Sequence, residues 1–244
     1  MQQNDWYENW FGSPYYKILY QDRDEQEARA FIENLINYLE PPADCRMLDI
    51  ACGEGRHAIQ LAEHGYDITA IDLSQANIET AKASENEHLH FFVHDMRFPF
   101  YINYFDFAFN FFTSFGYFIH DRDHLLAAKS FAGAIKKDGL LVIDYLNLDY
   151  VLQHMTTSQT VQRGSYTFHI QKTLLRNHIV KDIKFTDANN KSRHYTETVA
   201  AFRLQDFIEM FKKAGLSLVN TFGDYKLNEY HEADSLRMIM IFKK

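Results

Sequence analysis

The chain has 244 residues, of which 46% are apolar, and this suits one α/β domain with at most a small added subdomain. No window approaches 18 consecutive apolar residues, and the chain does not open on a basic segment followed by an apolar one, so we expect neither a membrane span nor a signal peptide. The net charge is −8 and the chain has no dense Lys/Arg stripe, which argues against nucleic acid as a partner. The two cysteines form no disulfide framework or metal motif, so we predict no metal site and a cytoplasmic setting.

The first 40 residues are aromatic, acidic and helical in pattern. From Ala28 to Leu39 the apolar residues recur at three- and four-residue spacing, and the pattern stops at Pro41-Pro42. Short apolar runs then alternate with helical stretches. The predicted strands are residues 46–52, 66–73, 88–95, 105–112 and 138–147, and the predicted helices are residues 55–65, 74–84 and 121–137. This alternation predicts βαβ units and hence a doubly wound parallel sheet with helices on both faces.

After residue 150 the pattern changes to that of antiparallel strands. Four alternating, β-branched runs are separated by turn sequences, at residues 158–163, 166–175, 178–186 and 192–201. The α/β pattern then returns, with a helix over 204–215 and strands over 216–223 and 235–244. The predicted organisation has three parts: an N-terminal helical cap (1–45), a core domain (46–150 and 204–244) and an antiparallel β insertion that acts as a substrate lid (151–203).

The sequence LDIACGEGRH at residues 48–57 places two glycines one residue apart, directly after a predicted strand. Together with Ala58 they satisfy the pattern G-x-G-x-x-A, and Asp72 follows the first glycine by 19 residues. This pattern is close to the dinucleotide fingerprint, so an NAD-binding oxidoreductase is one alternative. Asp49 within the strand and Glu54 between the glycines argue against it, because acidic side chains oppose a pyrophosphate at a helix N-terminus.

Three acidic residues lie in or at the ends of the first three predicted strands, where open α/β sheets bind ligands. We expect Asp72 to accept the ribose hydroxyls of an adenosine and Asp95 to meet the adenine edge. Asp49 and the backbone of residues 53–55 would serve a cationic methionine tail, whose sulfonium suits an acidic, aromatic-lined pocket. The structural alternatives are a local partner for Asp49 and helix-cap or turn roles for Asp72 and Asp95.

The ordered motifs D-I-A-C-G-E-G, A-I-D-L-S, H-D-M-R, F-D-F-A-F-N and K-K-D-G-L-L-V-I-D resemble those of the class I S-adenosylmethionine-dependent methyltransferases. The resemblance covers about residues 46–147 and resumes in the last helix and two strands. It implies an α/β fold with a doubly wound, seven-stranded Rossmann-like sheet whose last strand is antiparallel, and S-adenosyl-L-methionine as the cofactor. The cofactor-binding residues that it implies are Asp49, Ala51, Gly53, Gly55, Asp72, Leu73, Asp95, Met96 and Asn110.

The segment after the fourth predicted strand favours a small-molecule methyl acceptor. Enzymes that methylate nucleic-acid bases or protein amides often carry an Asn/Asp-Pro-Pro-aromatic motif there, whereas this chain has Asn110 without the prolines. The S-F-G-Y-F run at residues 114–118 resembles small-molecule members of the family, including sugar-amine and glycine N-methylating types. The prediction is therefore an enzyme that transfers a methyl group to N or O of a small molecule by in-line displacement.

The candidate substrate-side residues come from the N-terminal helices, the loop after the fourth strand and the insertion. We predict Tyr16, Tyr117 and His120 as catalytic, because Tyr and His can accept a proton. Further candidates for the pocket, including basic residues for an anionic substrate group, are Trp6, Trp10, Tyr15, Tyr145, Asn147, Arg163, Arg176 and His194. Arg56 and His57 either touch the cofactor carboxylate or are solvated. A non-catalytic cofactor-binding interaction module is the second alternative, and a homodimer through the insertion is a further expectation.

Overall fold

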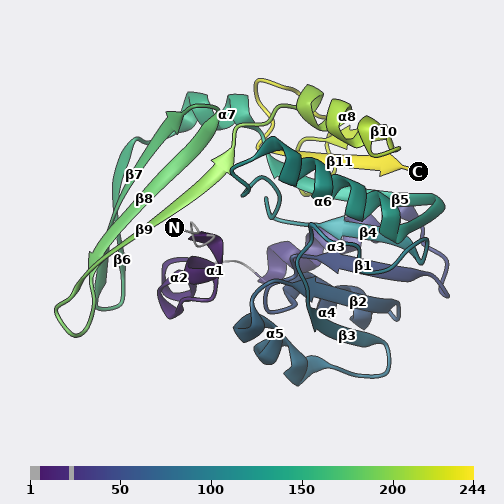
Figure 1. Ribbon diagram of the computed structural model, residues 1–244, viewed down its shortest axis with the longest axis horizontal. Coiled ribbons are helices and arrows are strands. Elements are labelled where there is room, and N and C mark those ends of the chain that lie inside the picture. The colour runs from purple at the N-terminus through teal and green to yellow at the C-terminus, as the bar shows by residue number, and fades with distance from the viewer. Residues whose placement is uncertain (1–5, 22–24) are drawn as a thin grey trace.

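The computed structural model describes residues 6–21 and 25–244, and a seven-stranded sheet forms its centre (Figure 1). The strand order is β10-β11-β5-β4-β1-β2-β3. Neighbouring strands are parallel except at β11, which runs antiparallel to β5 and to β10. The strands are β1 (Arg46–Ile50), β2 (Asp67–Asp72), β3 (Leu89–Val93), β4 (Phe105–Asn110), β5 (Ile135–Leu146), β10 (Ser217–Phe222) and β11 (Arg237–Lys243). This order confirms the predicted doubly wound, Rossmann-like fold class.

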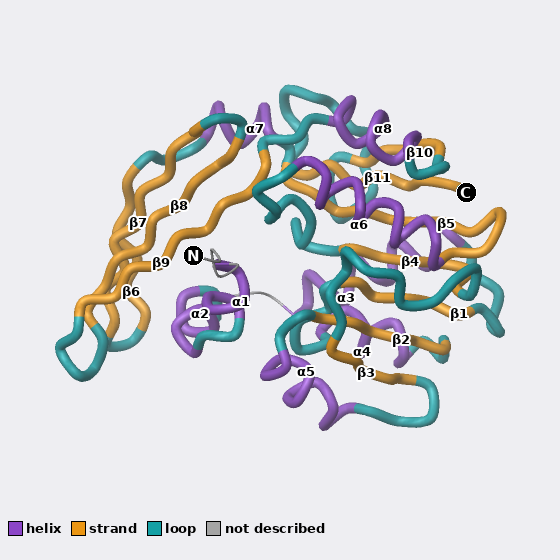
Figure 2. The backbone as a smooth tube through the Cα atoms, in the orientation of Figure 1, coloured by secondary structure: helices purple, strands orange, loops and turns teal. Residues whose placement is uncertain are grey.

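Helices cover both faces of the sheet (Figures 1 and 2). They are α3 (Glu25–Leu39), α4 (Arg56–Glu63), α5 (Gln75–Ala81), the 3₁₀ turn η1 (Lys82–Ser84), α6 (Asp121–Ala134) and α8 (Leu204–Lys213). Strand alternation sends Leu48 and Ile50 of β1 into the core with α6 and α8, and Met47 into the core with α3, α4 and α5. Because both faces are buried, side chains that bind a ligand are confined to the strand ends. None of the helices in the described ranges is long and apolar enough to cross a bilayer.

A four-stranded antiparallel sheet projects from the core after β5 (Figures 1 and 2). Its strands are β6 (Ser158–Arg163), β7 (Tyr166–Leu175), β8 (His178–Thr186) and β9 (Ser192–Ala200), which pair in chain order. Two short helices, α1 (Trp6–Phe11) and α2 (Pro14–Leu19), lie between this sheet and the seven-stranded one. Trp10 and Leu19 of these helices share a small core with Phe168, Ile170 and other residues of the insertion. The N-terminal helices therefore pack on the inner face of the insertion.

The structure differs from the sequence prediction at two places around β5. The predicted helix over 121–137 ends at Ala134, because Ile135 already pairs with Phe105 of β4 and begins the strand. Directly after β5, helix α7 (Leu148–His154) is not predicted. Its N-cap is Asn147, whose side chain accepts the N–H of Asp149. Seven residues are too few for a periodic apolar pattern, so local sequence gives little warning of this helix.

Candidate functional site

A cavity of about 990 Å³ opens at the carboxyl ends of the parallel strands. Its floor consists of the loops that follow β1, β2, β3 and β4, and its opposite wall comes from α1, α2 and β9. In Figure 1, α1 and α2 lie in the space between the two sheets, next to this edge. A volume of this size is at the upper end of the range for small-ligand sites, so the cavity has room for a cofactor and a second small molecule.

The loop after β1 presents its backbone to the cavity. Ala51, Gly53 and Gly55 have positive φ angles of 61°, 59° and 85°, a region that glycine enters most easily. A Cβ on Gly53 would meet no atom within 4 Å, so this stretch of backbone is open to a ligand. A Cβ on Gly55 would lie 2.5 Å from Cε1 of Phe91. Gly55 is not among the residues that line the cavity, and the absence of a side chain there leaves room for the Phe91 ring at the start of α4.

Asp49 of β1 is a buried carboxylate that reaches the cavity. It is 1% exposed, and its Oδ2 has no hydrogen-bond partner among the described residues. Burial and the charge of Asp72 raise the pKa of Asp49 to about 7, against the opposing effects of the Ala58 backbone and Arg56. A buried carboxylate oxygen without a partner is costly unless a donor or a cation meets it. This part of the cavity therefore suits a cationic group such as an ammonium.

Asp72 at the end of β2 is oriented by backbone donors. Its Oδ2 accepts the N–H of Gly53 and its Oδ1 accepts the N–H of Ser74, each at 2.8 Å. Burial raises the pKa of Asp72 in spite of these bonds. Since each carboxylate oxygen has a further acceptor site, Asp72 can take two ligand hydroxyls while it holds the glycine loop. The N-cap of α5 is Ser74, not Asp72, which removes the helix-cap alternative.

Asp95, after β3, lines the cavity together with Met96 and with Leu73 from the neighbouring loop. Its carboxylate accepts from Nη2 of Arg97 at 2.6 Å, from Nε at 3.0 Å and from the Arg97 backbone N–H. Asp95 thus combines a turn role with a position at the cavity. Because Arg97 balances its charge, Asp95 suits a neutral donor, such as the exocyclic amine of a base, better than a cation.

A polar cluster that the sequence did not predict lies on the other side of the cavity. Oδ1 of Asp144 in β5 accepts from Nε and Nη2 of Arg237 at 2.7 Å each, and Oδ2 accepts from Oη of Tyr225 at 3.0 Å. Nη2 of Arg237 also donates to Oγ1 of Thr113 at 2.9 Å. Burial opposes the charge on Arg237, but Asp144 and Tyr225 outweigh it and raise the pKa of Arg237 above its ordinary value. The available sequence signal was the single acid within the apolar run LLVIDYL.

Tyr16 and Tyr117, two of the three predicted catalytic residues, line the cavity. The ring of Phe11 lies 5.0 Å from each of theirs, centroid to centroid. Lys17 on α2 forms an ion pair with Glu54 of the glycine loop. The N-terminal helices therefore form an aromatic wall that contacts the predicted cofactor loop.

Two of the predicted site residues, His120 and Asn110, are not among the residues that line the cavity. His120 is the N-cap of the surface helix α6 and lines a shallow pocket with Ile119, Asp121 and Arg122, not the large cavity. His120 is close to Tyr117 in the sequence but does not reach the cavity, because the chain is at the molecular surface where α6 begins. Asn110 is fully buried, and its Nδ2 donates to the Ile50 carbonyl at 2.9 Å. It joins β4 to β1.

Most of the other candidates are core or surface residues. The cavity is not lined by Trp6, Trp10, Tyr15, Tyr145, Asn147, Arg163, Arg176 or His194. Arg56 and His57 do line it, which favours the reading that they face the cofactor side. The Arg56 guanidinium lies 5.4 Å from the ring centroid of Phe112, and the His57 ring lies 4.6 Å from that of Phe111. Both contacts orient these basic residues at the rim of the loop after β4.

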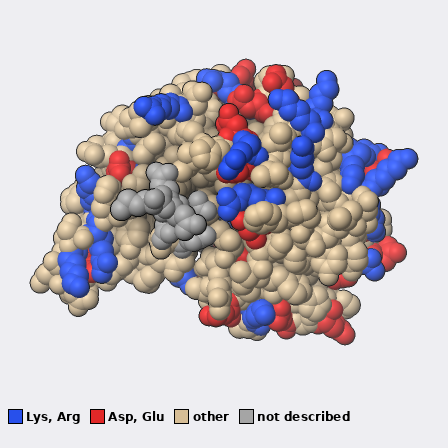
Figure 3. Space-filling model, in the orientation of Figure 1, with Lys and Arg blue, Asp and Glu red and all other residues tan. Residues whose placement is uncertain are grey.

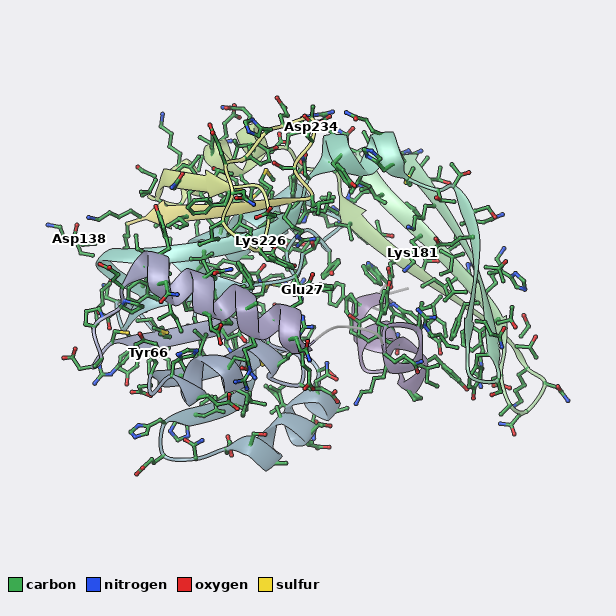
Figure 4. All side chains as sticks on the ribbon, turned by 180° about the vertical axis from the view of Figure 1, so that it is seen from behind. Glu27, Tyr66, Asp138, Lys181, Lys226 and Asp234 are labelled. Carbon is green, nitrogen blue, oxygen red and sulfur yellow. The ribbon has the colours of Figure 1, made fainter. Side chains whose placement is uncertain are left out.

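Glu197 of β9 connects the insertion to the N-terminal helices at the cavity wall. Its carboxylate accepts from Nε1 of Trp10 at 2.6 Å and from Oη of Tyr20 at 2.6 Å, and it pairs with Nζ of Lys181 at 3.3 Å. In Figure 4, Lys181 points from the insertion toward the N-terminal helices. Both charged side chains are 14% exposed, so the pair is largely shielded from water. The network holds the wall in place over the cavity.

Charged groups outside the cavity form no stripe of one sign on the face in Figure 3, where Lys and Arg are scattered among Asp and Glu. Within the described ranges, no three His, Cys, Asp or Glu side chains lie together in a way that would hold a metal ion. The cavity lining offers carboxylates, aromatic rings, hydroxyl groups and arginines.

Comparisons with known proteins agree with this architecture. Residues 47–139 match the family model of a methyltransferase domain. YqeM of Bacillus subtilis (strain 168), named as a candidate methyltransferase, is 26% identical over 216 residues, which are 83% of this chain and 86% of that protein. A solved S-adenosylmethionine-dependent methyltransferase from Clostridium acetobutylicum superposes with a TM-score of 0.79 at 18% identity, over 96% of this chain and 98% of that one. CalS10 of Micromonospora echinaspora, an amino pentose methyltransferase solved with its cofactor bound, superposes with a TM-score of 0.66 at 16% identity, over 91% and 92%.

Proposed function

The chain belongs to the class I S-adenosylmethionine-dependent methyltransferases, and from this we propose that it methylates a nitrogen or oxygen atom of a small molecule. The observation that carries the proposal is the cavity of about 990 Å³. It extends from the carboxyl ends of β1 to β3 to the wall formed by α1, α2 and β9. A cofactor on the strand side leaves space in the cavity for a small acceptor.

The side chains along β1 to β3 fit S-adenosyl-L-methionine. The unpartnered Oδ2 of Asp49 suits the ammonium of the methionine part, and the open backbone at Gly53 leaves room for it. Asp72 would accept the ribose hydroxyls, and Asp95 with Leu73 would meet the adenine. When bound, the cofactor supplies an electrophilic methyl group on a sulfonium. The carboxylates of Asp49 and Asp72 and the aromatic rings that line the cavity favour such a positive ligand.

The contribution of the protein itself is to orient the acceptor and exclude water. The wall of α1 and α2 is tied to the insertion through Glu197, so it holds an acceptor against the strand edge. Alignment of two reactants in a closed site can supply on the order of 7–11 kcal/mol in favourable cases. The rings of Tyr16 and Tyr117 would shape the space in which the acceptor lies.

We favour nitrogen as the methyl-accepting atom. CalS10, which shares the fold, is named as an amino pentose methyltransferase. A neutral amine attacks the methyl group with its own lone pair and, once methylated, releases its proton to water, so it requires no strong base. The hydroxyls of Tyr16 and Tyr117 are the groups proposed to hydrogen-bond to the amine and orient it. The homodimer and the cytoplasmic setting stay predictions from the sequence.

Calorimetric titration with S-adenosylmethionine and with its demethylated product S-adenosylhomocysteine tests the proposal, and we expect micromolar binding. A metabolite library with labelled S-adenosylmethionine then identifies the acceptor by turnover. The variant that tests the site is Asp72→Ala, which should weaken this binding. Its matched control is Asp67→Ala, because that change removes a carboxylate from the start of the same strand, far from the end that reaches the cavity. If the wild-type protein binds neither form of the cofactor, the proposal is wrong.

A further inference from the structure

Arg237 lies on the half of the strand edge that the proposed cofactor residues leave unused. The cofactor candidates follow β1, β2 and β3, which form one side of the sheet, whereas β4, β5 and β11 form the other. Arg237 is the first residue of β11 and pairs with Leu146, the last residue of β5. Because β11 is antiparallel, its first residue lies at the same edge as the carboxyl ends of β4 and β5, and Arg237 lines the cavity there.

The guanidinium of Arg237 is fixed with one nitrogen unused. Nε and Nη2 donate to Asp144, and Nη2 also donates to Thr113. The rings of Phe112 and Tyr225 lie 5.8 and 5.7 Å from its central carbon. In the described part of the chain Nη1 forms no hydrogen bond, so its two N–H groups are available to a ligand. The side chain is 18% exposed, which gives the cavity access to it without opening it to bulk water.

The loop that supports Arg237 has an unusual backbone. Phe112 and Thr113 have φ angles of +58° and +59°, a left-handed conformation that is rare for an aromatic and a β-branched residue. Asp144 holds both: its Oδ2 accepts the Phe112 N–H at 2.8 Å and its carbonyl accepts the Thr113 N–H at 2.9 Å. Such conformations persist where the surroundings impose them, and they cluster at binding sites. One buried carboxylate thus sets both the loop and the arginine.

We propose that Arg237 receives a carboxylate group of the methyl acceptor through Nη1, so that the acceptor is an anionic small molecule. The inference rests on the proposed methyl transfer. Asp144 already balances the charge of Arg237, and one nitrogen is left to donate, so the site suits a singly charged carboxylate better than a phosphate dianion. The carboxylate could come from the acceptor or from the methionine part of the cofactor; the position on the β4, β5 and β11 side assigns it to the acceptor.

The test compares amines that carry a free carboxylate with their neutral carboxamides, using amino acids and amino acid amides as probes. In the wild type, kcat/KM should favour the carboxylate of each pair. In Arg237→Gln this preference should fall by about 10- to 100-fold, mostly through KM, because a charged hydrogen bond is lost. The amides should change by less than about threefold. Calorimetric titration of the S-adenosylhomocysteine complex with the carboxylate probes gives the same comparison without turnover.

Two further variants separate binding from folding. Arg237→Gln leaves Asp144 buried without its partner, whereas the double variant Arg237→Gln with Asp144→Asn restores the charge balance and should fold even if the single variant does not. The double variant should show the same loss of carboxylate preference. Arg203 pairs with Asp149 at 2.8 Å outside the cavity, so Arg203→Gln is a matched control that should leave the preference unchanged.

The outcomes are distinct. Turnover of neutral acceptors with no preference for carboxylates overturns this inference and leaves the proposed function standing. A loss of S-adenosylhomocysteine affinity in Arg237→Gln that matches the loss for the acceptor assigns Arg237 to the cofactor and also overturns it. Failure of the wild type to bind either cofactor form removes the proposed function, and this inference with it.

Discussion

Replacing Asp49 by Asn should stabilise the cofactor-free protein above pH 7, although Asp49 belongs to the proposed cofactor site. The folded protein holds the pKa of Asp49 at about 7, against an ordinary value of 3.8. Between those values the folded state binds more protons than the unfolded state, so the free energy of unfolding falls as pH rises from about 4 to about 7. The difference of roughly 3 units corresponds to about 4 kcal/mol, all of it lost by pH 8. Asn has the same shape without the charge and should recover about 2–4 kcal/mol of this.

The same substitution should weaken cofactor binding, because the ionised Asp49 is the proposed partner of the cofactor ammonium. Wild-type affinity for S-adenosylmethionine should rise from pH 6 to 7.5 as Asp49 loses its proton in a range where an α-amino group remains mostly charged. In Asp49→Asn the affinity should be about 10- to 100-fold lower at pH 7.5, and its pH dependence should flatten.

Urea unfolding at pH 4 and pH 8 without cofactor measures the stability effect, and calorimetry at pH 6 and 7.5 measures the binding effect. Asp67→Asn at the exposed start of β2 is the control and should change neither. The reasoning is refuted if Asp49→Asn lowers stability at pH 8, or if its effect on stability is equal at the two pH values. In either case the buried carboxylate would not be the uncompensated charge that its surroundings indicate.

Three further predictions concern the cavity and the glycine loop beside it. Asp72→Ala should weaken S-adenosylmethionine binding by roughly 1–3 kcal/mol in calorimetry, since two hydroxyls and the Gly53 N–H lose their acceptor; an unchanged affinity would exclude Asp72 from the site. Gly55→Ala should lower the free energy of unfolding by at least about 1–2 kcal/mol, because alanine is strained at φ +85° and its Cβ meets the Phe91 ring, and Phe91→Leu should restore part of the loss. Removing a hydroxyl in Tyr16→Phe or Tyr117→Phe should lower kcat by about 5- to 30-fold for the tyrosine that orients the acceptor and leave cofactor affinity unchanged; an unchanged kcat in both variants would identify them as wall residues only.

Local sequence patterns predicted most of the strands, because residue alternation and turn sequences, which define a strand, are properties of short segments. The runs at 158–163, 166–175 and 178–186 have the bounds of β6, β7 and β8, since alternation of β-branched residues with turn sequences between them leaves little freedom in register. The boundary between α6 and β5 was wrong by three residues, because pairing of Ile135 with a strand distant in the chain decides it.

The two halves of the candidate site differed in how far the sequence could reveal them. Asp49 interrupts the apolar strand β1, Asp72 ends β2 and Asp95 follows the end of β3, and the topology alone brings such positions to one edge. The contact of Arg237 with Asp144 joins positions 93 residues apart, and that of Trp10 with Glu197 joins positions 187 apart. No spacing rule links such pairs, so only the folded chain identifies them.

By itself, the sequence determined the layered sheet, the cofactor class and the position of the acids that we propose for the cofactor side, because hydrophobic period and strand-end chemistry are properties of short segments. Only the tertiary structure decided which residues form the side of the cavity that we propose for the acceptor. Residues of the N-terminal helices, β5, β9 and β11 converge on one cavity there, while His120 faces the surface and Asn110 the core. The orientation of a side chain toward or away from a cavity depends on long-range packing, and burial then sets the charge balance that gives Asp49 and Arg237 their chemistry.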